Sequence, residues 1–203
     1  MGTENYSVGL YPGGIGCTMR TEFTYTDVGN MPYVVRFADP SDAASIVSLI
    51  RAVGSEDIYI ANEDDYYSAD QQQRILSQMN PDVQMVLVAL SGQKIIGTLE
   101  AVRGTFRKNR HVATFGMALA AESRGQGRGA GLLRTMEMWA QQHQIHKVAL
   151  SVFESNGAAI RFYLRHGYAV EASRPQQFYI SGHMVAEVFM AKYLPGISSP
   201  ERQ

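Results

Sequence analysis

The sequence predicts an α/β (α+β) fold in which a mixed, mostly antiparallel sheet of about six to seven strands carries helices on both faces. Three features indicate this class. Apolar residues recur at helical spacing in separate segments, strand-like runs lie between them, and Gly, Pro and Asn mark the boundaries. The 203 residues, 45% of them hydrophobic and 18% charged, suffice for one domain with a substantial core.

Four segments have the apolar spacing of helices. The first follows cap residues at 39–42 and ends at Gly54, and the second is opened by a capping box of Ser68 and Gln71. The third follows a glycine-rich loop, and the fourth begins at Asn156. The expected helices cover residues 41–53, 68–79, 132–143 and 156–166.

Strands are expected before and between these helices. Two apolar runs flank residues 91–93, a three-residue turn with a central glycine that predicts an antiparallel hairpin. The expected strands cover residues 33–38, 83–90, 95–102, 111–119, 147–153, a segment that starts at 167, and 183–194.

The two ends of the chain have no such pattern. We expect an N-terminal tail over residues 1–32 that is flexible or makes a local hairpin, one domain over 33–194 and a polar C-terminal tail over 195–203. The single cysteine, Cys17, excludes an intrachain disulfide, and its place in the N-terminal tail makes it a poor candidate for a nucleophile.

Charge and hydropathy exclude several classes of protein. The net charge of −1 and the lack of a basic run argue against nucleic-acid binding. Apolar windows fall short of the roughly 20 residues that a membrane span needs, and no secretory signal pattern is present, so we expect a cytoplasmic protein without a membrane partner. His143 and His146 have no further ligand nearby, and we expect no metal site.

The most informative stretch is Arg124–Ala130, which reads RGQGRGA between a strand and a helix. The first turn of a helix has unpaired N–H groups and the positive end of the helix dipole, and glycine lets an anion approach the backbone. Arg124 and Arg128 add positive charge. This stretch therefore predicts an anion-binding loop.

Two nucleotide-binding motifs fit the loop poorly. A nucleoside-triphosphate loop requires a Lys that is absent here. A dinucleotide motif is matched by Gly125, Gly127 and Ala130, and Glu154 stands near the place of a ribose-binding acid. However, residues 120–124 separate the strand from the first glycine, and only about fifty residues follow, too few for a second βαβ half.

Arg124-x-x-Gly127-x-Gly129 resembles the R/Q-x-x-G-x-G/A pyrophosphate loop of the GNAT superfamily of acyl-CoA-dependent N-acetyltransferases. Residues 156–168 resemble the N-x-x-A-x-x-x-Y-x-x-x-G-F/Y helix of the same superfamily, and the predicted order of elements agrees with its fold. Four residues near the C-terminus resemble a bacterial branch that includes amino-acid and polyamine acetyltransferases. They are Arg174, Phe178, Gly182 and Met190.

The resemblance implies acetyl-CoA as the acetyl donor. Backbone N–H groups of the loop would hold its pyrophosphate, and its pantetheine arm would enter between strand residues 117–119 and 150–152, often at a bulge. Two alternatives stay open: Arg128 as solvated surface and Asn156 as a helix cap. The implied donor-binding residues are Met117, Ala118, Leu119, Arg124, Gly125, Gln126, Gly127, Arg128, Gly129, Ala130, Asn156 and Tyr163.

The resemblance also implies catalytic roles. Tyr163 matches the position that protonates the departing thiolate, although a core tyrosine packed by Phe162 and Tyr168 is the alternative. A backbone N–H at a bulge near Leu119 would polarise the thioester carbonyl. Glu100 could act as the base, directly or through a water, or be an outward solvated residue. The second candidate for the base is Glu154.

The expected reaction is transfer of an acetyl group from acetyl-CoA to the primary amine of a small molecule, an amino acid or polyamine, by direct attack in a ternary complex. The acidic residues 63–65 would suit a cationic amine, and a solvated loop explains them equally well. Ala186 stands where the bacterial branch often has Asp, which leaves the acceptor open. Two alternatives are a protein N-terminal or lysine acetyltransferase and a non-catalytic CoA-binding module; a homodimer, common in the family, also stays open.

Overall fold

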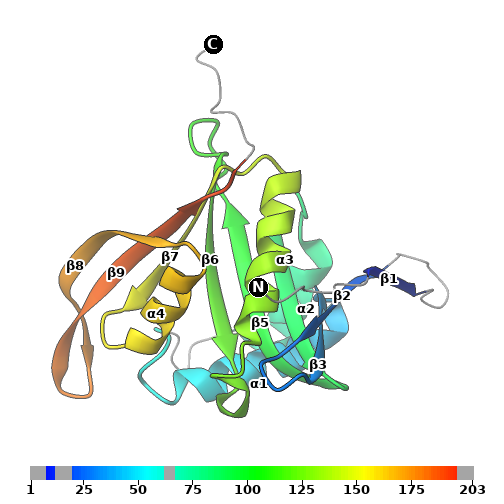
Figure 1. Ribbon diagram of the computed structural model, residues 1–203, viewed down its shortest axis with the longest axis horizontal. Helices are drawn as coiled ribbons and strands as arrows, with labels where there is room; N and C mark the ends of the chain where they lie inside the picture. The colour runs from blue at the N-terminus through cyan, green and yellow to red at the C-terminus, as the bar shows by residue number, and fades with distance from the viewer. Residues whose placement is uncertain (1–7, 12–19, 62–66, 196–203) are drawn as a thin grey trace.

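The computed structural model describes residues 8–11, 20–61 and 67–195. A nine-stranded sheet of order β1-β2-β3-β4-β5-β6-β7-β9-β8 runs through this part of the chain (Figure 1). Every neighbouring pair is antiparallel except β6 and β7, which are parallel. The strands are β1 (Val8–Tyr11), β2 (Arg20–Thr26), β3 (Pro32–Phe37), β4 (Gln84–Ser91), β5 (Lys94–Arg103), β6 (Val112–Leu119), β7 (Lys147–Phe153), β8 (Ala169–Ile180) and β9 (His183–Tyr193).

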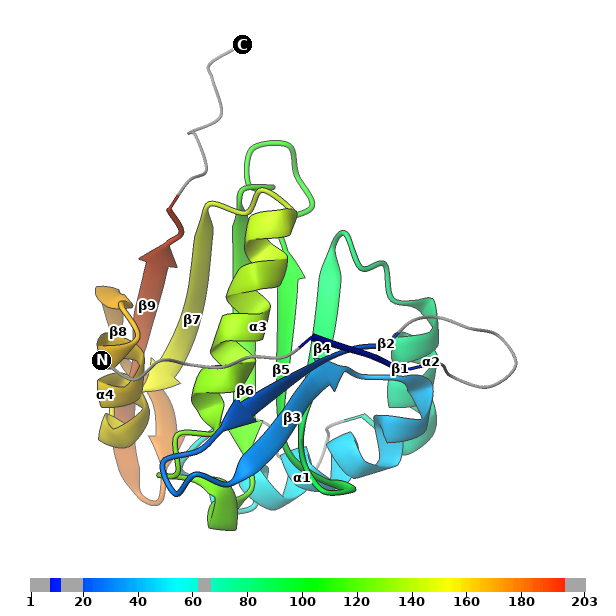
Figure 2. The ribbon, with the colours of Figure 1, turned by 45° about the vertical axis from the view of Figure 1, so that its right-hand side comes forward.

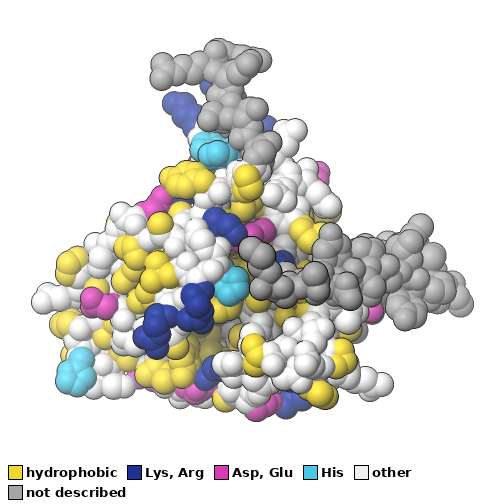
Figure 3. All heavy atoms as spheres, in the orientation of Figure 1, with side chains coloured by type: hydrophobic (Ala, Val, Ile, Leu, Met, Phe, Trp, Pro, Cys, Tyr) yellow, Lys and Arg dark blue, Asp and Glu magenta, His cyan; other side chains and the backbone are white. Residues whose placement is uncertain are grey.

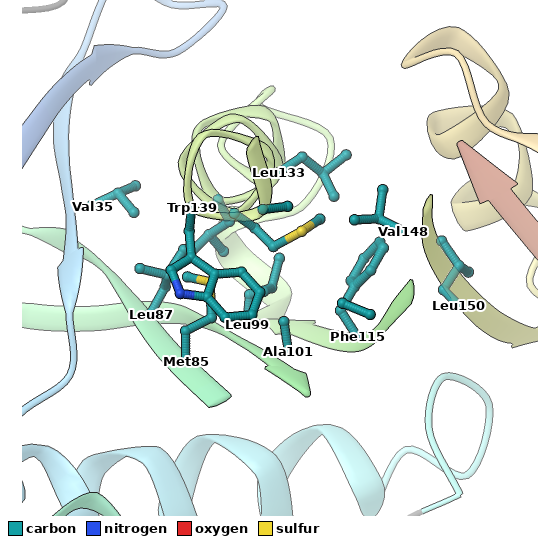
Figure 4. Close-up of a cluster of buried hydrophobic side chains, with 14 of the residues drawn as sticks. Val35, Met85, Leu87, Leu99, Ala101, Phe115, Leu133, Trp139, Val148 and Leu150 are labelled. Atoms are coloured by element: carbon teal, nitrogen blue, oxygen red, sulfur yellow. The ribbon is translucent and has the colours of Figure 1, made fainter. Parts of the chain in front are cut away.

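Helices cover both faces of the sheet. In Figure 4, α3 lies on one side of the central strands and α1 on the other, with the buried side chains of the main core between α3 and the sheet. None of the described helices is long and apolar enough to cross a lipid bilayer. The helices are α1 (Ala43–Gly54), α2 (Ala69–Gln78), α3 (Gly129–Gln142) and α4 (Gly157–Arg165), with 3₁₀ turns at Pro40–Asp42 and Ala121–Ser123.

The predicted helices and strands from residue 33 onward are confirmed, and so is the fold class. Local chemistry accounts for the helix boundaries. The Ser68 hydroxyl accepts the Gln71 N–H and the Gln71 side chain accepts the Ser68 N–H, which is the expected capping box at the start of α2. The hairpin of β4 and β5 also forms as expected.

The sheet has more strands than the six to seven that we expected, because residues assigned to a tail form β1 and β2. Residues 22–26 of β2 pair with β3. Phe23 and Tyr25 alternate inward from β2 and are buried in the main core. Tyr25 stacks on Tyr33 with ring centroids 5.7 Å apart, and its hydroxyl lies 2.9 Å from that of Thr135 in α3. Strands β1 and β2 form the local hairpin that was the alternative to a flexible tail, and β2 joins it to the sheet. Cys17 lies outside the described residues.

Strands β6 and β7 separate after a short paired stretch (Figure 1). Only residues 112–114 of β6 pair with residues 147–149 of β7. Beyond these the two strands run on without pairing to each other, and this opening is the β6–β7 gap. The register of β5 and β6 is regular, so the bulge expected near Leu119 is not found. Register shifts lie instead in the β4–β5 and β8–β9 pairs.

Candidate functional site

The loop between β6 and α3 has a backbone suited to binding an anion. Gly125 and Gly127 have φ angles of +71° and +78°, which a residue with a side chain adopts only with strain. The N–H groups of residues 126–129 donate to no acceptor among the described residues, whereas the Ala130 N–H donates to the Gly127 carbonyl at 3.0 Å. The loop thus presents consecutive N–H groups at the start of α3.

Arg124 is held by an acid from the α1–α2 connection. Its two terminal nitrogens donate to Glu56 at 2.7 and 2.5 Å, and its Nε donates to the Leu119 carbonyl at 2.9 Å. The guanidinium also stacks 4.2 Å from the centre of the Tyr59 ring. The Arg124 guanidinium lowers the pKa of Glu56 below its ordinary value. Arg124 therefore does not stand in the loop as an unpaired positive charge.

Arg128 is held by Asp27, which lies in the turn between β2 and β3. The Arg128 Nε donates to the Asp27 carboxylate at 3.0 Å, and its Nη1 donates to the Ser123 hydroxyl at 3.3 Å. Asp27 also accepts the Gly29 and Met31 N–H groups, each at 2.9 Å. The Met31 N–H, assisted by Arg128 and Gly29, holds the pKa of Asp27 below its ordinary value. Arg128 is therefore not a solvated surface side chain, which was the alternative.

The β2–β3 turn, residues 27–31, packs directly on the glycine loop (Figure 2). The Val28 N–H donates to the Gln126 carbonyl at 3.1 Å, and the Val28 Cγ1 lies 3.1 Å from where a Cβ on Gly127 would stand. Sequence reasoning missed this contact. Two signals were available: the alternation of Phe23 and Tyr25, and a turn-forming stretch rich in Asp, Gly and Asn just before a proline.

A cleft of about 780 Å³ joins the glycine loop to the β6–β7 gap and to α4, and we call it the loop cleft. It brings together every residue that the sequence predicted for donor binding except Gln126. The Gln126 side chain instead donates to the Glu122 carbonyl at 2.7 Å. Asn156 is the cap of α4, because its side chain accepts the Ala159 N–H at 3.0 Å, and the same residue lines the cleft.

Backbone groups of β6 face the gap. The Ala120 N–H donates to the Ile96 carbonyl in β5 at 2.9 Å. Because backbone groups alternate in direction along a strand, those of Met117 and Leu119 point away from β5, toward the side where β7 has separated. The Leu119 carbonyl accepts the Arg124 Nε from this side. The gap is therefore lined with backbone polar groups that the sheet does not use.

A second cavity of about 410 Å³ meets the loop cleft at the gap, and we call it the Glu100 cavity. Its walls are mainly apolar, and Glu100 is its only acidic residue among those described. The Glu100 carboxylate is half-buried and accepts a hydrogen bond from the Gln84 side-chain N–H at 2.6 Å. Glu154 is exposed and lines neither cavity, and residues 63–65 lie outside the described residues. The two cavities share Ile60, Phe115, Gly116, Met117, Ala118 and Ser151.

Tyr163 lies in the hydrophobic core and in the wall of the loop cleft. Its ring centroid is 5.3 Å from that of Phe162, 5.6 Å from that of Tyr168 and 6.0 Å from that of Phe115. Burial raises the pKa of Tyr163 above its ordinary value, so the hydroxyl keeps its proton through neutral pH. The Tyr163 side chain therefore packs in the core, which was the alternative interpretation, and it also lines the cleft.

The sequence is similar to those of known acetyltransferases. Residues 53–168 match the acetyltransferase (GNAT) family. The chain is 25% identical over 113 residues, 55% of its length, to the L-amino acid N-acetyltransferase AaaT of Escherichia coli (strain K12), of which this covers 69%.

Solved structures agree. An acetyltransferase of the GNAT family from Streptococcus pneumoniae superposes with a TM-score of 0.74 at 25% identity, covering 80% of this chain and 99% of that one. The yncA protein of Salmonella typhimurium, solved with its cofactor acetyl-CoA, superposes with a TM-score of 0.75 at 22% identity, covering 84% and 99%. Both the sequence and the fold lead to one conclusion: the chain belongs to the acetyltransferase (GNAT) family.

Proposed function

We propose that this acetyltransferase transfers an acetyl group from acetyl-CoA to the primary amine of a small molecule, an amino acid or a polyamine-like compound, by direct attack in a ternary complex. One observation carries the proposal. The loop cleft and the Glu100 cavity meet at the β6–β7 gap. A ligand in one cavity can therefore react at the gap with a ligand in the other. The relative named as an L-amino acid N-acetyltransferase supports an acceptor of this class.

The residues of the loop cleft fit acetyl-CoA. Consecutive N–H groups at residues 126–129, without acceptors among the described residues, suit a pyrophosphate. The backbone groups of Met117 and Leu119 suit the amides of the pantetheine arm, which can pair with a strand edge. Acetyl-CoA supplies an acetyl group activated as a thioester.

The catalytic steps assigned to this chain are proton transfers and charge stabilisation. Glu100 takes the proton of the ammonium group, directly or through a water, and passes it to solvent. The amine nitrogen then forms the amide bond as the carbon–sulfur bond breaks, and it loses its second proton to water. A backbone N–H of Met117 or Leu119 stabilises the negative charge on the carbonyl oxygen. The Tyr163 hydroxyl gives its proton to the departing sulfur and regains one from solvent. No covalent enzyme intermediate is needed.

The size of the Glu100 cavity favours a small acceptor. About 410 Å³ holds a compact amine, and its single described acid among apolar walls suits a cation with an apolar or methylene body. The proposal is tested by incubating the full chain with acetyl-CoA and a panel of amino acids, polyamines, peptides with a free N-terminus and lysine-containing peptides, while free thiol is measured.

We expect amine-dependent thiol release with a small amine and acetylation of that amine by mass spectrometry. Release only with peptides would favour a protein acetyltransferase. Binding of CoA without release for any amine would favour the non-catalytic module and contradict the proposal.

A further inference from the structure

The positive charge expected at the glycine loop is already used within the protein. Arg128 pairs with Asp27 and Arg124 pairs with Glu56. CoA carries a third phosphate, a phosphomonoester on its ribose, in addition to the pyrophosphate that the loop N–H groups suit. A dianion of this kind is bound most strongly by cations that have no acid of their own.

Helix α4 supplies two such cations. Arg161 and Arg165 are four residues apart, so they lie on one side of the helix, and both line the loop cleft. Both side chains are exposed, and neither forms an ion pair with an acid among the described residues. The acid that lines the same cleft, Glu187, pairs with Arg174 at 3.4 Å. Figure 3 shows Lys and Arg side chains gathered over α4.

Packing places this side of α4 next to the glycine loop. The Phe162 ring comes within 3.1 Å of where a Cβ on Gly129, the first residue of α3, would stand. Arg165 and His166 follow Phe162 by three and four residues and so lie one turn along the same side. The Arg161 Nη1 lies 3.1 Å from the corresponding point on Gly157, so this guanidinium lies along the first turn of α4.

We propose that Arg161 and Arg165 form a subsite for the ribose phosphomonoester of the donor, separate from the pyrophosphate loop. This inference rests on the proposed function, in which the donor is acetyl-CoA. The two guanidiniums donate to the phosphate oxygens, and His166 borders the subsite. The pair thus makes the enzyme discriminate between CoA and dephospho-CoA, which lacks only that phosphate.

The test compares the affinities of CoA and dephospho-CoA for the full chain by isothermal titration calorimetry. We expect the wild type to bind CoA about tenfold more tightly than dephospho-CoA, a preference that shrinks as salt is raised because exposed charges are screened. In Arg161→Gln/Arg165→Gln we expect the two affinities to become equal, through weaker binding of CoA and unchanged binding of dephospho-CoA.

Two further variants separate charge from fold. Arg161→Lys/Arg165→Lys keeps the positive charge and should retain most of the preference. Arg107→Gln removes an exposed arginine from a loop that lines neither cavity, and it should leave the preference as in the wild type.

The inference is overturned if the wild type binds both ligands equally, or if the double Gln variant weakens both by the same factor, since the arginines would then act on the pyrophosphate. A wild type that binds neither ligand refutes the proposed donor, and the inference with it. A wild type that binds both equally and still acetylates amines refutes the subsite alone.

Discussion

Tyr163 belongs to the hydrophobic core and to the wall of the loop cleft at once. Burial raises the pKa of the Tyr163 hydroxyl, which keeps it protonated but also makes it a weaker acid toward a thiolate, so the proposed proton transfer depends on close contact with the sulfur. A substitution of Tyr163 can therefore separate an effect on catalysis from an effect on donor binding.

Replacing Tyr163 with Phe keeps the ring and removes the proton. We expect kcat to fall about 100-fold, because general acid catalysis is lost, while CoA affinity changes by less than about twofold. Tyr168→Phe is the matched control: it also removes a buried hydroxyl, one that donates to Glu137 at 3.2 Å, but outside both cavities. It should cost about 1 kcal/mol of stability and leave kcat near wild type. Equal loss of kcat in both variants would contradict the role of Tyr163.

Glu100 is expected to matter most where the amine is protonated. Glu100→Gln should lower kcat/KM for the amine about 100-fold near neutral pH, and the deficit should narrow as pH approaches the pKa of the amine, which then loses its proton to water. The measurement is a pH–rate profile of both proteins. Glu154→Gln removes an exposed carboxylate that lines neither cavity and should follow the wild-type profile. A deficit that stays constant with pH would indicate a structural role for Glu100.

At the level of elements, the β2–β3 turn adds an acid-sensitive contact to the loop. The pKa of Asp27 is lowered in the folded protein, so its charge stabilises the fold above the ordinary value of 3.8, and that stabilisation is lost as pH falls through the folded-state pKa. Asp27→Asn keeps the shape of the side chain without the charge. We expect wild type to have the higher melting temperature at pH 7, and we expect the difference to shrink as pH falls below about 4 and to vanish only below the folded-state pKa of Asp27. A difference independent of pH would argue against the Asp27–Arg128 pair.

The glycine loop depends on a backbone that side chains disfavour. Gly127→Ala should cost about 1–2 kcal/mol through its positive φ and through the approach of Val28, and it should also weaken CoA binding about tenfold by shifting the loop N–H groups. Gly182, at φ +85° in the β8–β9 hairpin, supplies the control. Gly182→Ala carries the same backbone strain away from the cleft, so it should lower the melting temperature and leave CoA affinity unchanged. If both variants lost affinity for CoA, the loss would be due to lower stability and not to the glycine loop.

Across the whole molecule, periodic patterns and cap residues predicted the elements from residue 33 onward, because each rests on local spacing. Strand β2 escaped this reasoning, since only Phe23 and Tyr25 face the core and the strand gains its stability from pairing with β3. The partners of the loop arginines could not be predicted either. Glu56 is 68 residues from Arg124 and Asp27 is 101 residues from Arg128, distances over which sequence pattern carries no signal.

The meeting of two cavities at the β6–β7 gap has a consequence for the order of events in turnover. Both cavities are open to solvent, and they share lining residues at the gap. In the proposed reaction, the donor would enter through the loop cleft and the acceptor through the Glu100 cavity, so we expect that CoA can depart without prior removal of the acetylated amine.

Initial rates with both ligands varied should give intersecting double-reciprocal lines, with CoA competitive against acetyl-CoA and non-competitive against the amine. Parallel lines would reveal an enzyme that carries the acetyl group itself between two half-reactions.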